Sequence, residues 1–335
     1  MNLDLRHLRV VCAIAETGSV TKAAAALGLA QPALTAQLQR IERTLGGPLF
    51  ERDRRGSRPT ALGELVLARA RVLLPAMQGL QDEAARLAGG APARHRIGAV
   101  NGPILGGLVH RLANADPDTQ VTTYASWSAD ELAELVLAGR LDYALVGRCG
   151  DAAPPAGLAW RVVAVDAVFV LFPDRHPLAR RALESSRRRA TPRVDTATPS
   201  EVDLAELAEA QWAVTPGDGC FADCFAAACA RAGFTPRTMY ETDVGGCVDL
   251  VLAGDAIALC QGTFRRMPGL VAVPLAGAPL RWRHLLGWHP DSTAAALAET
   301  VCGYATAAYR DAVQRSADYP QWLEEHPRFG VPHLV

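Results

Sequence analysis

The sequence predicts an α/β protein in three parts: a small helical N-terminal domain, one long helix, and a C-terminal pair of Rossmann-like α/β subdomains. Three observations lead to this fold class. Short helical segments are separated by glycines before residue 48, apolar residues follow a heptad spacing from Val66 to Leu87, and strand and helix patterns alternate beyond residue 94. We expect an N-terminal domain at 1–60, a linker helix and hinge at 61–93, a C-terminal domain at 94–315 and a C-terminal tail at 316–335.

The composition is typical of a globular protein with real cores, at 50% hydrophobic and 21% charged residues in a chain of 335. No apolar run approaches the roughly 20 residues of a membrane-spanning helix, and the charged N-terminus is unlike a signal peptide. We therefore expect a cytoplasmic protein with no membrane partner. The 8 cysteines have no repeated spacing, which predicts reduced thiols.

Positive charge is concentrated at the N-terminus. Residues 1–60 contain nine Lys and Arg against five Asp and Glu, whereas the whole chain has a net charge of −1. A basic segment on an otherwise acidic chain predicts a polyanionic partner for that segment. Lys22 is the only lysine, which excludes a lysine-containing phosphate loop and Schiff-base chemistry.

The first 47 residues predict three helices. Apolar residues at helical spacing place the first at 4–16, and Ser19 is a good N-cap for the second, which is rich in alanine and ends before Gly28. The third starts near Pro32, because proline is tolerated in the first helical turn. Its expected inner stripe consists of Leu34, Leu38, Ile41 and Leu45.

The opposite face of the third helix has an unusual composition for a solvated surface. Glutamine, threonine and arginine are the side chains that hydrogen-bond base edges and phosphates in a major groove. Two short helices joined by a tight turn, the second polar, form the helix-turn-helix pattern. We expect this helix to contact DNA through Gln31, Pro32, Thr35, Gln39, Arg40 and Arg43.

A short basic hairpin is expected next. Leu49 and Phe50 begin a strand, and a Gly-Ser turn is surrounded by arginines that could hold phosphates, as in the wing of a winged helix-turn-helix. These arginines are Arg52, Arg54, Arg55 and Arg58. The alternative is a three-helix bundle with a solvated arginine loop.

The segment from Leu8 to Gly63 resembles the winged helix-turn-helix of LysR-type transcriptional regulators. It contains, in order, Gly-Ser, Ala-Ala, Gln-Pro-Ala, Leu-Gly, Leu-Phe-x-Arg and Thr-x-x-Gly. Three positions depart from the family pattern: Val11 replaces a frequent Phe, Ala30 a frequent Ser and Ala36 a common Arg. Loss of the Ser should weaken the helix cap by roughly 1 kcal/mol, and Ala36 lacks the side chain of one usual DNA contact.

The long helix after Thr60 carries a heptad seam. Its members are spaced alternately by four and three residues: Val66, Ala70, Leu73, Met77, Leu80, Ala84 and Leu87. A seam of this length needs a partner helix, and the alternative is a helix packed on its own domain. Pro75 should kink it. The resemblance implies a linker helix that pairs two subunits, in a homodimer or homotetramer.

The C-terminal part predicts two α/β subdomains, at about 94–163 with 269–315 and at about 164–268. Leu87 to His95 reads as a linker, and Arg187 to Pro199 as a polar, mobile insertion. The expected strands are 95–100, 120–125, 142–147, 162–173, 209–216, 237–242, 255–260, 270–277 and 283–290, and the expected helices are 104–115, 129–141, 220–233, 244–254 and 292–313. The segment from 270 to 290 should return a strand, together with the last helix, to the first subdomain.

Ligands of open α/β sheets bind at the carboxyl ends of the strands, so a cleft between the subdomains is the expected effector site. The pattern is similar to the effector-binding half of LysR regulators, which resembles periplasmic binding proteins. The resemblance implies effector contacts at Val100, Gly102, Ser128, Arg148, Pro216 and Cys220, and the same strand ends carry Asn101, Pro103, Trp127 and Asp243. Arg148 would favour an anionic effector or pair with a nearby acid, and Trp127 would stack on a ligand or pack in a core.

Two classes of function remain. The first is a transcription factor that binds an inverted repeat in double-stranded DNA, responds to a small molecule and, by the resemblance, acts on RNA polymerase at a neighbouring gene through T-N11-A sites. The second is a small-molecule-binding protein or thiol sensor whose N-terminal segment serves assembly. In a thiol sensor, the redox-active or metal-binding residues would be Cys220, Cys224 and Cys229. The alternative is that these three cysteines are buried small hydrophobes. Catalytic motifs are absent from the sequence, and we expect no enzyme activity, cofactor or resident metal.

Overall fold

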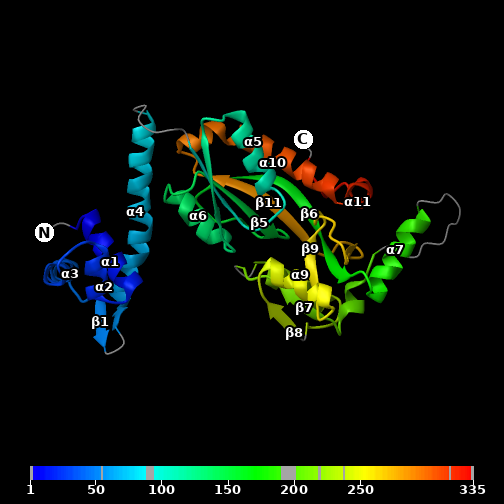
Figure 1. Cartoon of the computed structure of the whole chain (residues 1–335), viewed down its shortest axis with the longest axis horizontal. Coiled ribbons are helices and arrows are strands. Elements are labelled where there is room, and N and C mark those ends of the chain that lie inside the picture. The colour runs from blue at the N-terminus through cyan, green and yellow to red at the C-terminus, as the bar shows by residue number, and fades with distance from the viewer. Residues whose placement is uncertain are drawn as a thin grey trace. The chain divides into compact units, whose positions relative to one another are not determined.

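The computed structural model describes residues 3–53, 56–87, 94–189, 201–217, 220–236, 238–316 and 318–332. The chain divides into two compact units, one built on the N-terminal residues to Pro92 and the other containing most of the rest. Each is described by itself. The N-terminal unit contains α1 (Leu5–Thr17), α2 (Val20–Ala26), α3 (Gln31–Leu45), β1 (Phe50–Asp53), β2 (Gly56–Pro59) and α4 (Ala61–Leu87) (Figure 1).

The three short helices pack around one apolar core, as the sequence predicts. Asp4 caps α1 through its side chain, and Gly18 ends it with a φ of 62°, in the left-handed region that favours glycine. Ala23 and Ala24 of α2 are fully buried, because alanine lets α2 lie close to its neighbours. Leu34, Leu38 and Ile41 of α3 are buried in the same core and Leu45 packs against it partly buried, which confirms the expected inner stripe.

The predicted hairpin forms and is attached to the helices at two points. β1 and β2 are antiparallel, with Phe50 opposite Pro59. The amide of Ser57 donates to the carbonyl of Gly18 at 2.9 Å, and the amide of Leu49 donates to the carboxylate of Glu42 in α3 at 2.9 Å. The hairpin is therefore fixed beside α3.

The predicted seam of α4 divides into two parts. Thr60 caps the helix, accepting from the amide of Gly63 at 3.0 Å. Val66 and Ala70 are buried in the core of the N-terminal unit. This part of the helix therefore packs on its own domain, which was the alternative to pairing with a second chain. The helix continues past Pro75, whose side chain lies outside the described residues, as does that of Leu87. Further along, Leu73, Met77 and Leu80 are 50%, 36% and 60% exposed in a single chain.

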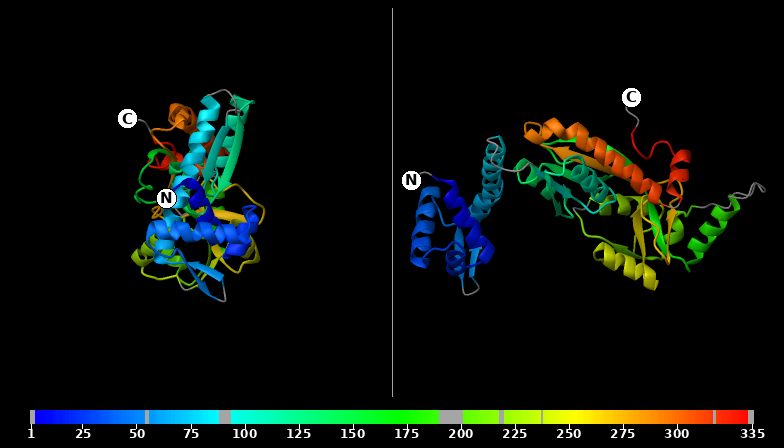
Figure 2. Two further views of the ribbon diagram at one scale, coloured as in Figure 1. Left: turned by 90° about the vertical axis from the view of Figure 1, so that its left-hand side faces the viewer. Right: turned by 45° about the horizontal axis from the view of Figure 1, so that its top comes forward.

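The C-terminal unit is built on a mixed sheet that is continuous through two subdomains (Figures 1 and 2). Its strands are β3 (Arg94–Ala99), β4 (Gln120–Ala125), β5 (Tyr143–Cys149), β6 (Ala159–Pro173), β7 (Gln211–Val214), β8 (Thr238–Glu241), β9 (Ile257–Gln261), β10 (Leu270–Pro274) and β11 (Arg281–Trp288). The strand order is β4-β3-β5-β11-β6-β9-β7-β8, with β10 also paired to β6. The pairs β3–β4, β3–β5, β7–β8 and β7–β9 are parallel, as the alternation of strands and helices predicts.

Helices cover this sheet. They are α5 (Leu105–Ala115), α6 (Ala129–Leu137), α7 (Pro177–Arg189), α8 (Cys220–Arg231), α9 (Val244–Ala253), α10 (Ala298–Arg315) and α11 (Tyr319–Glu325), with short 3-10 helices η1 (Leu204–Leu207) and η2 (Thr293–Leu297). In the first subdomain α5 and α10 pack side by side (Figure 2). Their apolar faces close one core, and a second core lies in the other subdomain under α7 and α8.

Strand β6 links the two subdomains, and it corrects the expected boundaries. Its residues up to Ala167 pair with β11, whereas those from Val168 onward pair with β9 and β10. The change of subdomain thus falls within one strand rather than at 163/164. The expectation that 270–277 returns to the first subdomain is wrong, because β10 pairs with the second half of β6. Of the elements expected to return, β11 and α10 do so.

Two helices were not expected from the sequence. Helix α7 contains Arg187–Arg189, the start of the expected polar insertion, and residues 190–200 of that insertion lie outside the described part. The expected tail contains α11, and its Tyr319, Trp322 and Phe329 are buried in the core of the first subdomain. The linker residues 88–93 also lie outside the described residues.

None of the helices in the described ranges combines the length and the apolar character needed to cross a membrane.

Candidate nucleic-acid interface and effector cleft

Helix α3 presents a polar face to solvent, directly opposite its buried stripe. Thr35 is half-buried, and its hydroxyl accepts a hydrogen bond from the side-chain amide (Nε2) of Gln31 at 3.0 Å. This bond holds both side chains on the same face of the helix. The other residues of this face are exposed: Gln31, Pro32, Gln39, Arg40 and Arg43. The structure thus brings the predicted α3 residues together on one surface.

The two arginines of α3 are held along the helix by their own backbone. Nε of Arg40 donates to the carbonyl of Ala36, and Nε of Arg43 donates to that of Gln39, both at 3.3 Å. Their guanidinium groups therefore extend over the exposed face, where they can reach phosphates or base edges. The carboxylate of Glu42 points to the wing instead, since it accepts from Leu49.

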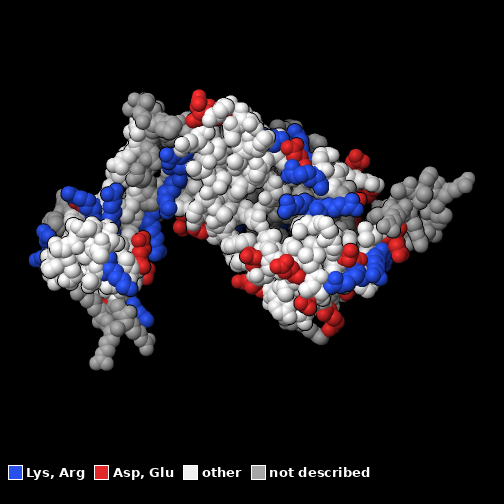
Figure 3. Space-filling model, in the orientation of Figure 1, with Lys and Arg blue, Asp and Glu red and all other residues white. Residues whose placement is uncertain are grey.

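The wing adds a further basic side chain beside α3. Arg58 is exposed on β2, opposite Glu51 of β1. Arg54 and Arg55 lie outside the described residues, and the side chain of Arg52 is not described either. Figure 3 shows Lys and Arg side chains at several places on the surface of the N-terminal unit.

The start of α3 lacks a side-chain cap. Ala30 has the extended backbone of an N-cap residue, with φ −70° and ψ 134°, but no side chain satisfies the first amides of the helix. This is the consequence expected from alanine at a position where the resembled family often has serine. Amides left open at a helix start could be satisfied by a DNA phosphate.

A cleft of about 390 Å³ lies between the two subdomains of the C-terminal unit. One wall comes from the loops after β3 and β4, and the other from the start of α9. Its lining consists of Ala99, Val100, Asn101, Gly102, Leu105, Ala125, Ser126, Trp127, Asp243, Val244 and Gly245. Trp127 is 40% exposed and lines the cleft, so the core-packing alternative is wrong.

Half of the predicted effector residues line this cleft. Val100, Asn101, Gly102, Trp127 and Asp243 do so, whereas Pro103, Ser128, Arg148, Pro216 and Cys220 are not part of its lining. Asp243 also caps α9, accepting from the amide of Gly246 at 2.8 Å. The lining also contains Ala99, Leu105 and Ala125, which were not predicted, and Ser126, Val244 and Gly245, which belong to the strand ends at 126–128 and 242–246 where the sequence places ligand contacts.

Two of the displaced residues have structural partners. Arg148 is buried and forms an ion pair with Asp130 of α6 at 3.1 Å, which is the alternative that the sequence left open. Ser128 accepts from the amide of Glu131 at 3.1 Å and so caps α6. Among the described residues that line the cleft, Asp243 is the one with a charged side chain, and its charge is negative. Because Arg148 is not part of the lining, the reason to expect an anionic effector is removed.

The cysteines group differently from the expectation. Cys229 is fully buried in the core of the second subdomain, and burial raises its pKa to about 11, so it behaves as a small hydrophobe. Cys220 and Cys224 are half-buried and lie against Cys149 at the end of β5. Cys149 was missed because it is about seventy residues away in sequence.

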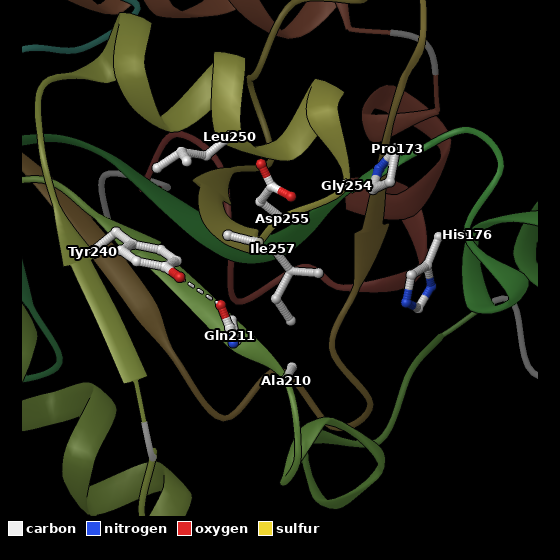
Figure 4. Close-up of a pocket in the computed structure, with 10 residues that line it drawn as sticks. Pro173, His176, Ala210, Gln211, Tyr240, Leu250, Gly254, Asp255 and Ile257 are labelled. Atoms are coloured by element: carbon white, nitrogen blue, oxygen red, sulfur yellow. Dashed lines mark hydrogen bonds between the residues drawn. The ribbon is translucent and has the colours of Figure 1, made fainter.

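A second cavity, of about 620 Å³, lies in the second subdomain at the amino ends of β7 and β9 (Figure 4). The hydroxyl of Tyr240 donates to the side-chain carbonyl of Gln211 at 2.7 Å on one side. On another side His176 stacks on Phe172, with ring centroids 4.6 Å apart, and its burial lowers the pKa of the imidazole. No sequence pattern pointed to this cavity, because its walls come from five elements that are separate in the chain, β6, β7, β8, α9 and β9.

Comparison with known proteins decides the family. Residues 5–64 match the model of the bacterial regulatory helix-turn-helix protein, lysR family. Residues 88–189 and 190–310 match the LysR substrate binding domain. The chain belongs to the LysR family. It is a DNA-binding transcriptional regulator with a substrate-binding domain, and it is not an enzyme.

Curated relatives of this LysR regulator support the same conclusion. It is 37% identical over 327 residues to a small neutral protease regulatory protein of Streptomyces coelicolor, covering 97% of this chain and 92% of the relative. It is 35% identical over 192 residues to the HTH-type transcriptional regulator CbbR of Sinorhizobium medicae, covering 56% and 59% of the two chains.

Solved structures share the fold of the regulator. The LysR family transcriptional regulator CbnR matches with a TM-score of 0.61 at 20% identity, over 92% of this chain and 99% of that one. CbnR complexed with its target DNA matches with a TM-score of 0.60, also at 20% identity, over 92% and 100%.

Proposed function

We propose that the regulator reads duplex DNA with the exposed face of α3 and holds the flanking phosphates with its wing. The observation that carries this proposal is the division of α3: Leu34, Leu38 and Ile41 are buried, while the amide and guanidinium side chains of the same helix face solvent. Bidentate contacts from such side chains distinguish base pairs in the major groove. On α3, the side chains that would contact bases and phosphates are Gln31, Thr35, Gln39, Arg40 and Arg43, with Pro32 at the start of the helix. On the wing, the side chains that would contact phosphates are Arg52, Arg54, Arg55 and Arg58.

We propose that two chains pair through α4 and bind the two halves of an inverted repeat. The exposed Leu73, Met77 and Leu80 support this pairing, since they extend the seam beyond the residues that pack on the N-terminal core. Two reading helices at a fixed spacing explain how one short helix per chain gains affinity. The same pairing allows a tetramer of two dimers.

We propose that the cleft between the C-terminal subdomains binds the effector. Trp127 and Leu105 offer an apolar surface, and Asp243 offers a carboxylate oxygen beside its cap. This chemistry favours a small ligand with a planar or apolar part and a hydrogen-bond donor. A ligand that touches both walls would change the angle between the subdomains. Strand β6 connects them, since its first half belongs to one subdomain and its second half to the other.

The relatives support a proposal for the target gene. We propose that the regulator controls a neutral protease gene, because the match to the small neutral protease regulatory proteins extends over 97% of this chain. Activation would act through RNA polymerase at that promoter, from a site of the T-N11-A form. We expect a cytoplasmic location, because the DNA that the protein binds lies there.

The DNA-reading proposal is tested with two matched variants in a gel-shift titration. The DNA is a duplex selected from a random pool by the full chain. Gln31→Ala should weaken binding to the selected duplex by roughly 5- to 150-fold, the size of one base contact of about 1–3 kcal/mol, with little effect on non-specific DNA. Arg58→Ala should weaken both equally and reduce the salt slope by about 1. Equal effects of the two variants on both duplexes would reject the assignment of α3 to base reading.

A further inference from the structure

Three cysteine thiols meet where the two subdomains of the C-terminal unit join. Cys149 is the last residue of β5, a strand of the first subdomain, and Cys220 and Cys224 are one turn apart on α8 of the second. The amide of Cys149 donates to the sulfur of Cys220 at 3.3 Å. The side chain of Cys224 lies next to the Cys149 thiol and contributes to the raised pKa of that thiol.

The position of the Cys224 sulfur is fixed by a second observation. A Cβ atom placed on Gly150 would lie 3.7 Å from this sulfur, so the sulfur rests against the chain just after Cys149. Helix α8 packs directly on β5. Cys149 is 1% exposed and belongs to the core of the second subdomain, although its strand belongs to the sheet of the first.

We propose that Cys149 and Cys224 form a reversible disulfide that ties β5 to α8 and fixes the junction of the two subdomains. The bond would join the carboxyl end of a strand of one subdomain to the first turns of a helix of the other. Both elements lie beside the β7–α8 loop, where a Cβ atom placed on Gly217 would lie 4.0 Å from the carbonyl oxygen of Trp127 in the cleft. The disulfide would therefore restrict the movement that an effector in the cleft requires.

The chemistry is thiol–disulfide exchange with a low-molecular-weight disulfide. Cys224 is half-buried, whereas Cys149 is buried and burial raises its pKa, so the Cys224 thiolate attacks first and releases one small thiol. The Cys149 thiolate then attacks the sulfur of Cys224 in the mixed disulfide and releases the second. Two protein thiols are oxidised and one small disulfide is reduced to two thiols, which balances atoms and electrons.

The test is peptide mapping of the full chain after treatment with oxidised glutathione. We expect two thiols per chain to be lost, a peptide pair linking Cys149 to Cys224, and recovery of both thiols with dithiothreitol. Cys224→Ala should abolish the linked peptide pair. Cys247→Ala is the matched control and should retain it, because Cys247 lies in a separate apolar cluster of the same subdomain.

Two further outcomes decide the proposal. Oxidation should raise the melting temperature of the C-terminal unit by about 4 °C or more, since the bond closes a long loop, and Cys224→Ala should remove this shift. A bond between Cys220 and Cys224, persistence of the free Cys149 thiol, or glutathione left on Cys224 would overturn the proposal. The mapping needs no DNA, so its failure is distinguishable from a failure of the DNA-reading proposal.

Discussion

Substitution of Leu80 by Ala tests the pairing of two chains through α4. The side chain of Leu80 is 60% exposed in the single chain. Complete burial of a leucine stabilises by about 1.5–3 kcal/mol, so a partner helix that covers the exposed part would contribute roughly 1–2 kcal/mol. Because a symmetric pair carries the substitution twice, the dimer should lose about 2–4 kcal/mol. The dissociation constant should then rise by about 30- to 1,000-fold.

Sedimentation equilibrium of the full chain measures this constant, and thermal unfolding monitors the fold. Val66→Ala is the matched control, because Val66 is 7% exposed and packs in the N-terminal core. It should lower the melting temperature with a smaller effect on association, whereas Leu80→Ala should change association with the melting temperature of the isolated monomer unchanged. An unaltered dissociation constant for Leu80→Ala would refute the assignment of this seam to the subunit interface.

Three further predictions concern stability and are read from thermal or urea unfolding. Ala30→Ser should stabilise the N-terminal unit by about 1 kcal/mol, since it supplies the missing cap of α3; no gain would mean that the first amides of α3 are already satisfied. Gly147→Ala should destabilise the C-terminal unit by about 1–3 kcal/mol, because its Cβ would lie 1.9 Å from the ring of Trp282, and a neutral result would contradict that packing. Tyr319→Phe should cost about 1–3 kcal/mol by leaving the amide of Ala167, 3.0 Å from the hydroxyl, without its acceptor; Tyr304→Phe on the neighbouring helix is its control.

The N-terminal unit could be predicted almost completely from the sequence. Its elements are short, and each is set by residues close in the chain: Ser19 before α2, Pro32 at the start of α3, and the stripe of Leu34, Leu38 and Ile41. Such local periodicity and capping signals are available without any knowledge of distant contacts. The exposed α3 face follows from the same periodicity.

The C-terminal unit shows where this reasoning ends. The strand pattern predicted β6, but nothing local indicates that Ala167 pairs with β11 and Val168 with β9. The pairing of Arg148 with Asp130 and the meeting of Cys149 with Cys224 depend on how β5 packs against α6 and α8. The buried contacts of α11 are equally distant in sequence, since Tyr319 reaches back to Ala167. Long-range packing of this kind leaves no periodic trace in one sequence.

The central claim is that α3 recognises a DNA sequence, and one titration tests it most directly. Fluorescence anisotropy of the full chain is measured with a selected duplex and with the same bases in scrambled order, at several salt concentrations. The account predicts at least about 1,000-fold tighter binding to the selected duplex at physiological salt, and affinities that fall steeply as salt rises. Equal affinity for both duplexes at every salt concentration would contradict it.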